Sequence, residues 1–263
     1  MNRQAQAAVL FLLGAALLHA GFTDLYLRYV KAGLQPLLLL SGAVLIVAAL
    51  ATAWYEWRTP RTAHADGDAH VAEHAAEHRE DHGDDEGDDG HGHSHREPRI
   101  SWLLVLPLFA LILIAPPALG SYSAVRSGTA LQQPYGYAKL PASDPLPMSL
   151  VDYAGRAVYD HGRSIGRRQV RVTGFVALDR KGTPYLVRMA LNCCAADAQP
   201  VKIGLTGKIP PVLQPDTWLQ VTGTYTARET RDPVNNGPVP YLQVTRATPV
   251  PTPHDPYDES WNQ

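Results

Sequence analysis

The sequence predicts a membrane protein with three transmembrane α-helices followed by a small C-terminal all-β domain, an OB-like barrel. Three observations predict this class: three long runs without a charged residue, one acidic and histidine-rich stretch, and a series of short strand patterns near the C-terminus. Residues 56–99 hold 13 of the 25 acidic residues against 5 of the 23 basic ones, a net charge of −8, whereas the rest of the chain carries +6. This segregation excludes an ordinary soluble globular protein and a strongly basic nucleic-acid binder.

The three uncharged runs cover residues 5–22, 34–55 and 100–125. A bilayer core of about 30 Å needs about 20 apolar residues in a helix, which the second and third runs supply and the first nearly does. The first two runs therefore predict a helical hairpin over residues 1–55, with helices at about 5–22 and 34–55. The third run predicts a helix over 100–122. An alternative for the first run is a cleaved signal peptide, because it follows Arg3 and has a small residue near Ala20.

Lysine and arginine near the helix ends predict the orientation in the membrane. Five arginines lie on the side of the N-terminus and the linker, and three basic residues lie on the other side: Arg3, Arg58, Arg61, Arg96 and Arg99 against Arg28, Lys31 and Arg126. Since basic residues concentrate on the cytoplasmic side, the sequence predicts a multi-pass protein of the cell membrane with a cytoplasmic linker and an extracytoplasmic C-terminal domain.

The linker, residues 56–99, has almost no large apolar side chains and is expected to be disordered. Its histidines recur every fourth residue and then in an alternating run: His70, His74, His78, His82, His91, His93 and His95. Imidazole and carboxylate groups are common ligands of zinc and similar ions, so weak and collective binding of a divalent metal is predicted here. The alternative is a soluble spacer between two apolar segments. No other cofactor is expected.

After the third run, residues 123–165 are rich in Pro, Gly, Ser and Ala and predict a stalk, with a weak helical signal over 149–161. The remaining residues, 166–263, form the expected β domain and its C-terminal tail. Its predicted strands are 169–176, 184–191, 201–205, 218–225 and 241–248. Gly174 interrupts the first of them, as a bulge or bend requires. Five short strands with such a glycine favour an OB-type barrel.

Many OB barrels bind nucleic acid, but this region has no dense basic and aromatic patch and is expected outside the cell, so no nucleic-acid partner is predicted. The sequence also has no Ser/His/Asp set, no phosphate-binding loop and no HExxH motif, and so no enzymatic activity is expected.

The one concentrated chemical signal is the group Cys193, Cys194 and Asp197, directly after the second predicted strand. Thiolates beside a carboxylate bind metals, and two adjacent cysteines can also form a vicinal disulfide. A third interpretation is structural: only one of two adjacent strand residues faces the core, which would make one cysteine buried and the other incidental.

The order of these parts resembles the YcgQ-type subunit of two-component bacterial membrane permeases, which accompanies a multi-spanning YcgR-type permease. Residues 166–176 are similar to the family's segment that leads into the first strand, and residues 218–223 to its Trp-x-x-Val-x-Gly strand. Residues 193–198 resemble its Cys-x-Ala-Asp-Ala-like signature, and the tail 253–257 resembles its Asp-Pro-Tyr ending.

The resemblance implies an accessory subunit of a permease complex, with the YcgR-type permease and the lipid bilayer as partners and a link to divalent-metal or small-solute transport. It also marks Cys193, Cys194 and Asp197 as a recurring motif without assigning their role. The uncharged runs agree, since ion paths usually carry charged or histidine residues within their spans, and His19 is the only histidine in these runs. The alternative is a membrane-anchored binding or scaffold protein without a role in transport.

Overall fold

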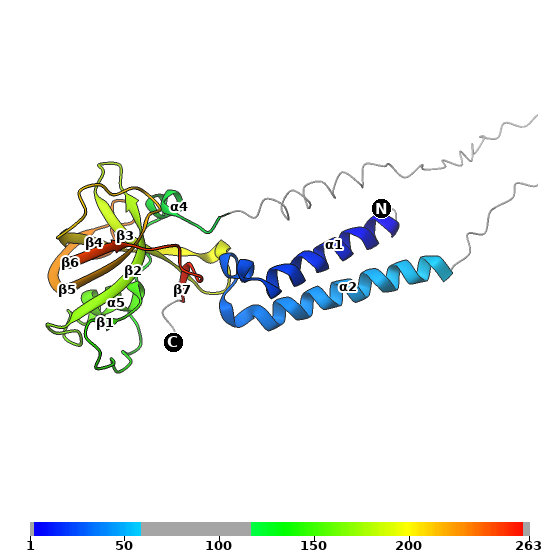
Figure 1. Cartoon of the computed structure of the whole chain (residues 1–263), viewed down its shortest axis with the longest axis horizontal. Helices are drawn as coiled ribbons and strands as arrows, with labels where there is room; N and C mark the ends of the chain where they lie inside the picture. Colours follow the sequence, from blue (N-terminus) through cyan, green and yellow to red (C-terminus); the bar gives the residue numbers. More distant parts are fainter. Residues whose placement is uncertain (1–2, 59–116, 260–263) are drawn as a thin grey trace, which may run out of the picture.

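The computed structural model describes residues 3–58 and 117–259, as a long helical hairpin with a β domain at one end of it (Figure 1). The β domain lies at the turn between the two helices, away from the N-terminus. Most of the predicted linker and of the predicted third helix lies outside the described residues. In the described end of that predicted helix, residues 117–120 are not helical, and a separate helix begins at Ser121. The seven linker histidines predicted to bind metal also lie outside them.

The hairpin consists of α1 (Arg3–Phe22) and α2 (Gln35–Arg58), as the sequence predicts. Two short 3₁₀ helices connect them, η1 (Asp24–Arg28) and η2 (Ala32–Leu34). A side chain at Gly14 would place its Cβ 2.9 Å from the carbonyl oxygen of Gly42. The small residues therefore let the two backbones approach closely, as is common in membrane helix pairs.

Both helices are long and apolar enough to cross a membrane, and most of their surface is not covered by the rest of the protein. The core helix of a soluble protein would instead bury its apolar side chains. Large apolar side chains that stay exposed here include Phe11, Leu37, Leu40, Val44, Val47, Leu50 and Trp54. An apolar surface of this extent calls for a lipid or protein environment.

Five strands close into a barrel: β2 (Gln169–Leu178), β3 (Pro184–Leu191), β4 (Gln199–Gly207), β5 (Trp218–Arg231) and β6 (Pro238–Pro249). The ring runs β2–β5–β6–β4–β3 and returns to β2, with every pair antiparallel except β4–β6. All five predicted strands are thus confirmed. Two short strands, β1 (Leu146–Pro147) and β7 (Tyr257–Glu259), lie parallel to β2 and β3.

Gly174 marks the bend in β2 that closes the barrel. The strand pairs with β5 up to Phe175 and with β3 from Phe175 onward. A Cβ at Gly174 would lie 2.7 Å from the carbonyl oxygen of Val187, so only glycine permits this approach. The register with β5 continues through Gly174, which makes it a bend, and the register shifts occur instead between β5 and β6.

The predicted stalk, 123–165, needs correction because much of it packs on the barrel. Helix α4 (Ser121–Arg126) lies against β2 and β3. Helix α5 (Leu150–Tyr159) begins at Ser149, whose side chain accepts a hydrogen bond from the Asp152 N–H at 3.0 Å. Its apolar residues recur at helical spacing, and Leu150 and Tyr153 are fully buried in the barrel core.

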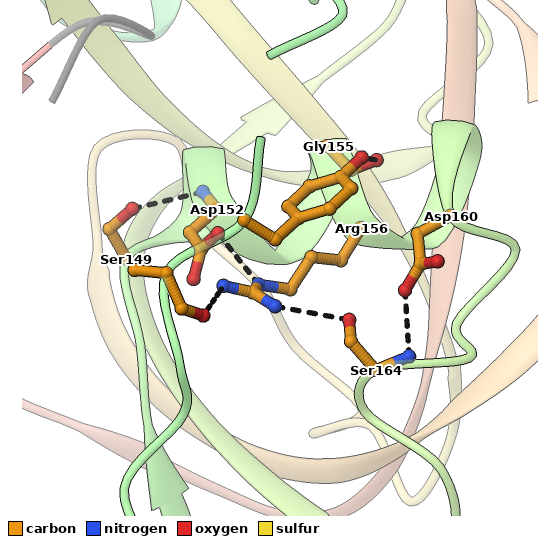
Figure 2. A network of polar contacts seen from close by, with 8 residues as sticks. Ser149, Asp152, Gly155, Arg156, Asp160 and Ser164 are labelled. Carbon is orange, nitrogen blue, oxygen red and sulfur yellow. Dashed lines mark hydrogen bonds and ion pairs between the residues drawn. The ribbon is translucent and has the colours of Figure 1, made fainter. Parts of the chain in front are cut away.

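Arg156, fully buried on α5, ties the Pro-rich segment before the helix to α5 and to the turn after it (Figure 2). Its Nε lies 2.8 Å from Asp152 Oδ1, and its two terminal nitrogens donate to the Ala138 carbonyl at 2.8 Å and the Ser164 hydroxyl at 3.1 Å. Asp160 accepts a hydrogen bond from the Ser164 N–H at 2.7 Å. Polar contacts thus hold a segment whose composition alone suggests no packing.

Candidate functional site

The loop after β3 carries Cys193, Cys194 and Asp197, and the Asp197 carboxylate closes it. One carboxylate oxygen accepts hydrogen bonds from the Cys193 N–H and the Cys193 thiol, both at 2.9 Å. The other accepts the Asn192 N–H at 3.1 Å. A short 3₁₀ helix, η4 (Ala195–Asp197), returns the chain so that the carboxylate faces the two preceding cysteines. The predicted cluster is therefore assembled by the loop itself.

The electrostatics of the loop keep the Cys193 thiol protonated. Its hydrogen bond to Asp197 raises the pKa of Cys193 to about 11, because ionisation would place a second negative charge beside the carboxylate. Burial acts to raise the pKa of Asp197, but the hydrogen bonds from Cys193 and Asn192 outweigh it and lower that pKa below its usual value. A thiol of this kind is a poor nucleophile at neutral pH.

Neither cysteine is a core residue: Cys193 is exposed and Cys194 is partly exposed. The interpretation of one buried cysteine with an incidental neighbour is therefore wrong. Side chains of adjacent extended residues normally point to opposite faces. Here the two sulfur atoms and a carboxylate oxygen of Asp197 instead all lie within 4.8 Å of one another.

The backbone of the same loop pairs with the turn of the helical hairpin. Cys194 forms an antiparallel bridge with Val30. The Lys31 N–H donates to the Cys193 carbonyl at 3.0 Å, and the Ala195 N–H donates to the Tyr29 carbonyl at 2.7 Å. The motif therefore has two parts with separate roles. Its backbone docks the barrel on the hairpin, and its side chains take no part in that backbone pairing.

The C-terminal tail is the second segment, after the cysteine loop, that contacts the hairpin turn. The Tyr257 hydroxyl donates to the Arg28 carbonyl at 3.1 Å and accepts the Leu119 N–H at 3.0 Å. His254 Nε2 lies 2.5 Å from Asp24 Oδ2. Three segments far apart in the sequence therefore meet at this point: the hairpin turn, the residues just before α4, and the tail.

Arg188 on β3 fixes the tail in this place. Its Nε lies 3.1 Å from Asp258 Oδ1, and its Nη2 donates to the carbonyls of Asp255 at 2.9 Å and Tyr257 at 3.1 Å. The guanidinium lies 5.0 Å from the centre of the Trp218 ring. Both charges are nearly buried, so this pair anchors Tyr257 rigidly.

A cleft of about 460 Å³ opens where the three segments meet. Prolines and small side chains form much of its wall, and one acid, one arginine and one histidine provide its charge. The lining residues are Asp24, Leu25, Arg28, Pro117, Ala118, Thr252, Pro253, His254 and Pro256. The cleft thus belongs to the junction between the hairpin and the β domain.

The structure brings together one of the two predicted sites, Cys193, Cys194 and Asp197; the histidine site lies outside the described residues. Sequence analysis missed the junction residues, above all Tyr257 and the hairpin turn at 29–31. The similarity of the tail to the family ending was the one signal that pointed there.

Comparison with known proteins adds one finding. Residues 153–258 match a family model described as the DUF1980 C-terminal domain. This segment begins within α5 and ends in β7, and so includes the barrel and the cysteine motif. No curated protein and no solved structure matches the chain.

Proposed function

We propose that this protein is a non-enzymatic, membrane-anchored accessory subunit of a YcgR-type permease complex, linked to transport of a divalent metal or another small solute. One observation carries the proposal: the barrel is docked by backbone pairing on the turn of an apolar helical hairpin, at residues 29–31 and 193–195. Such docking would hold the cysteine motif at the membrane surface, where the transport path of a partner permease would open.

The membrane part serves as an anchor in this proposal. Both described helices and the uncharged run from residue 100 to the residues before Pro117 span the bilayer, with the linker in the cytoplasm and the barrel outside. The close contact of α1 with α2 at Gly14 and Gly42 supports a retained first helix over a cleaved signal peptide. Residues 5–22 and 37–55 carry no Asp, Glu, Lys or Arg, which disfavours an ion path through the hairpin.

The β domain is OB-like in this proposal. A closed five-stranded barrel with a bend at Gly174 and one parallel pair, β4–β6, supports it. Such barrels bind ligands and partners through their loops, and here the loop after β3 carries the motif.

The histidine-rich linker, 56–99, is the cytoplasmic counterpart. Its eight histidines and thirteen acidic residues favour weak, multi-site binding of zinc or a similar ion close to the membrane. The linker would then buffer the ion on the inner side while the barrel faces the outer side.

The experiment is co-purification of the full chain with the multi-spanning permease expressed beside it. A stable complex, together with solute uptake that requires both chains, would support the accessory role. The second candidate function, a membrane-anchored scaffold, is favoured if the two chains do not associate. The cleft of about 460 Å³ at the junction is the feature that such a scaffold would offer to another protein.

Topology has its own test with single cysteines introduced into a chain whose native cysteines are serine. Tyr135 is fully exposed in the segment between α4 and α5, and Tyr135→Cys should react with a membrane-impermeant maleimide on intact cells. Ser94→Cys in the linker should react only after the cells are broken. The opposite pattern would invert the orientation and remove the outer location of the motif.

A further inference from the structure

We propose that Cys193, Cys194 and Asp197 form a three-ligand site for a thiophilic divalent cation of the zinc class. The site itself stands on the geometry of the loop, and its use in transport rests on the proposed function. The assignment starts from the convergence of the two sulfur atoms and one carboxylate oxygen within 4.8 Å of one another. Two consecutive side chains point to the same side here, and a loop with a purely structural role does not need this arrangement.

The spacing comes within about 1 Å of tetrahedral coordination, since the three ligand atoms lie within 4.8 Å of one another. With Zn–S bonds of about 2.3 Å and Zn–O bonds of about 2.1 Å, the ligand atoms of a tetrahedral site lie about 3.6–3.8 Å apart. Cys193 Sγ and Asp197 Oδ2 now share a hydrogen bond at 2.9 Å. Replacing the thiol proton by an ion therefore requires these two atoms to separate by less than about 1 Å. Side-chain rotation in an exposed loop supplies that movement.

The ligand set selects the ion. Thiolates favour zinc and other soft or borderline ions over magnesium and calcium, which prefer oxygen ligands throughout. Asp197 is held for this role, because the backbone N–H groups of Asn192 and Cys193 fix the orientation of its carboxylate. On binding, each cysteine that becomes a ligand gives its proton to the solvent.

Three protein ligands leave a fourth position open, as in zinc sites that exchange a ligand. Cys193 is exposed, so a water molecule or a side chain of a partner can reach the ion. The backbone of the same residues is paired with the hairpin turn at Val30 and Lys31. The ion would therefore sit at the junction of the barrel with the hairpin, in a place suited to hand-over to a membrane partner.

The test uses the full chain in detergent, reduced, with the eight linker histidines changed to serine so that these imidazoles do not compete with the barrel loop for metal. Titration with Cd²⁺ is followed by the ultraviolet absorption of cadmium–thiolate bonds. We expect saturation at about one ion per chain, loss of about half the absorption in Cys193→Ser and in Cys194→Ser, and displacement by Zn²⁺. Asp197→Asn should weaken binding by about tenfold or more.

Asp179→Asn is the matched control. Asp179 also closes a barrel turn, by accepting the N–H groups of Lys181 and Thr183 at 2.8 Å, but it is not part of the three-residue cluster. Its substitution should leave cadmium binding unchanged. Two results would overturn the site: no thiolate absorption in the reduced chain, or recovery of a Cys193–Cys194 disulfide from membranes alkylated at once on lysis. Failure to co-purify with the permease, with metal binding intact, would count against the accessory role alone.

Discussion

Replacing Tyr257 by phenylalanine should loosen the barrel from the hairpin while leaving the barrel folded. The Tyr257 hydroxyl makes two hydrogen bonds, with the Arg28 carbonyl at 3.1 Å and the Leu119 N–H at 3.0 Å. The phenyl ring of the variant keeps the volume and the burial of the tyrosine ring, which is 3% exposed. Only the polar link between tail, hairpin turn and the segment before α4 is removed.

The magnitude follows from the bond that crosses the junction. A single intramolecular hydrogen bond contributes about 0.5–1.5 kcal/mol net, so loss of the bond to Arg28 should raise the open fraction of the junction about 2- to 13-fold. Loss of the hydrogen bond from the Leu119 N–H adds to this increase if no water molecule replaces the hydroxyl as acceptor. The backbone pairing of residues 29–31 with 193–195 remains, so the junction opens more often but still closes.

Hydrogen exchange measures this opening directly. The Lys31 and Ala195 amides donate across the junction, and their exchange rates report its local opening. Both should exchange about 2- to 13-fold faster in Tyr257→Phe than in the parent chain, and core amides of β2 should not change. Tyr135→Phe, at a fully exposed tyrosine, is the matched control and should change neither. Equal exchange at Lys31 and Ala195 in both variants would refute a docking role for Tyr257.

Three further predictions concern the β domain of the full chain. Gly174→Ala should lower stability by about 1–3 kcal/mol, seen as a lower Tm, because the new Cβ would lie 2.7 Å from a β3 carbonyl oxygen. Asp232→Asn should cost about 3–5 kcal/mol in denaturant unfolding, because it leaves the buried Lys202 ammonium, now 2.7 Å from the carboxylate, without its counter-charge. Hydrogen bonds from Ser164 lower the pKa of Asp160, so this carboxylate stabilises the fold above about pH 4 and the benefit disappears as pH falls through the lowered pKa. Asp160→Asn should therefore be less stable than the parent at pH 7, with the difference shrinking below about pH 4.

The strands could be predicted because each one combines alternation with a boundary residue. Pro184 and Leu191 bound β3 in the structure as in the prediction, while β5 and β6 run further than predicted. The extra residues in β5 pass a register shift against β6, and a shifted ladder blurs the alternation that sequence analysis relies on.

The segment before the barrel could not be predicted, because its stability comes from long-range polar contacts. Its Pro-rich composition indicates a stalk, yet Arg156 joins it to α5, and Lys202 donates to the Ser127 carbonyl at 2.8 Å. A buried arginine or lysine is rare and is paired when it occurs, but nothing in the local sequence of Arg156 or Lys202 tells it apart from a surface residue.

The composition of the cysteine motif indicated where the site lies but did not decide between its possible chemical roles. Its residue types predicted a metal, a disulfide or a buried thiol, and the buried thiol differs from the other two in where two adjacent side chains point. The direction of the side chains depends on Asp197, which folds the loop back. It also depends on residues 29–31, which form backbone hydrogen bonds with the loop although they lie more than 160 positions earlier in the sequence. The hairpin forms hydrogen bonds with the backbone of the loop, and the cysteine side chains lie on the side that faces solvent. The docking of the barrel and the exposure of the thiols therefore depend on the same loop conformation. A change that undocks the loop should therefore also disturb the cation site, even where no ligand is altered.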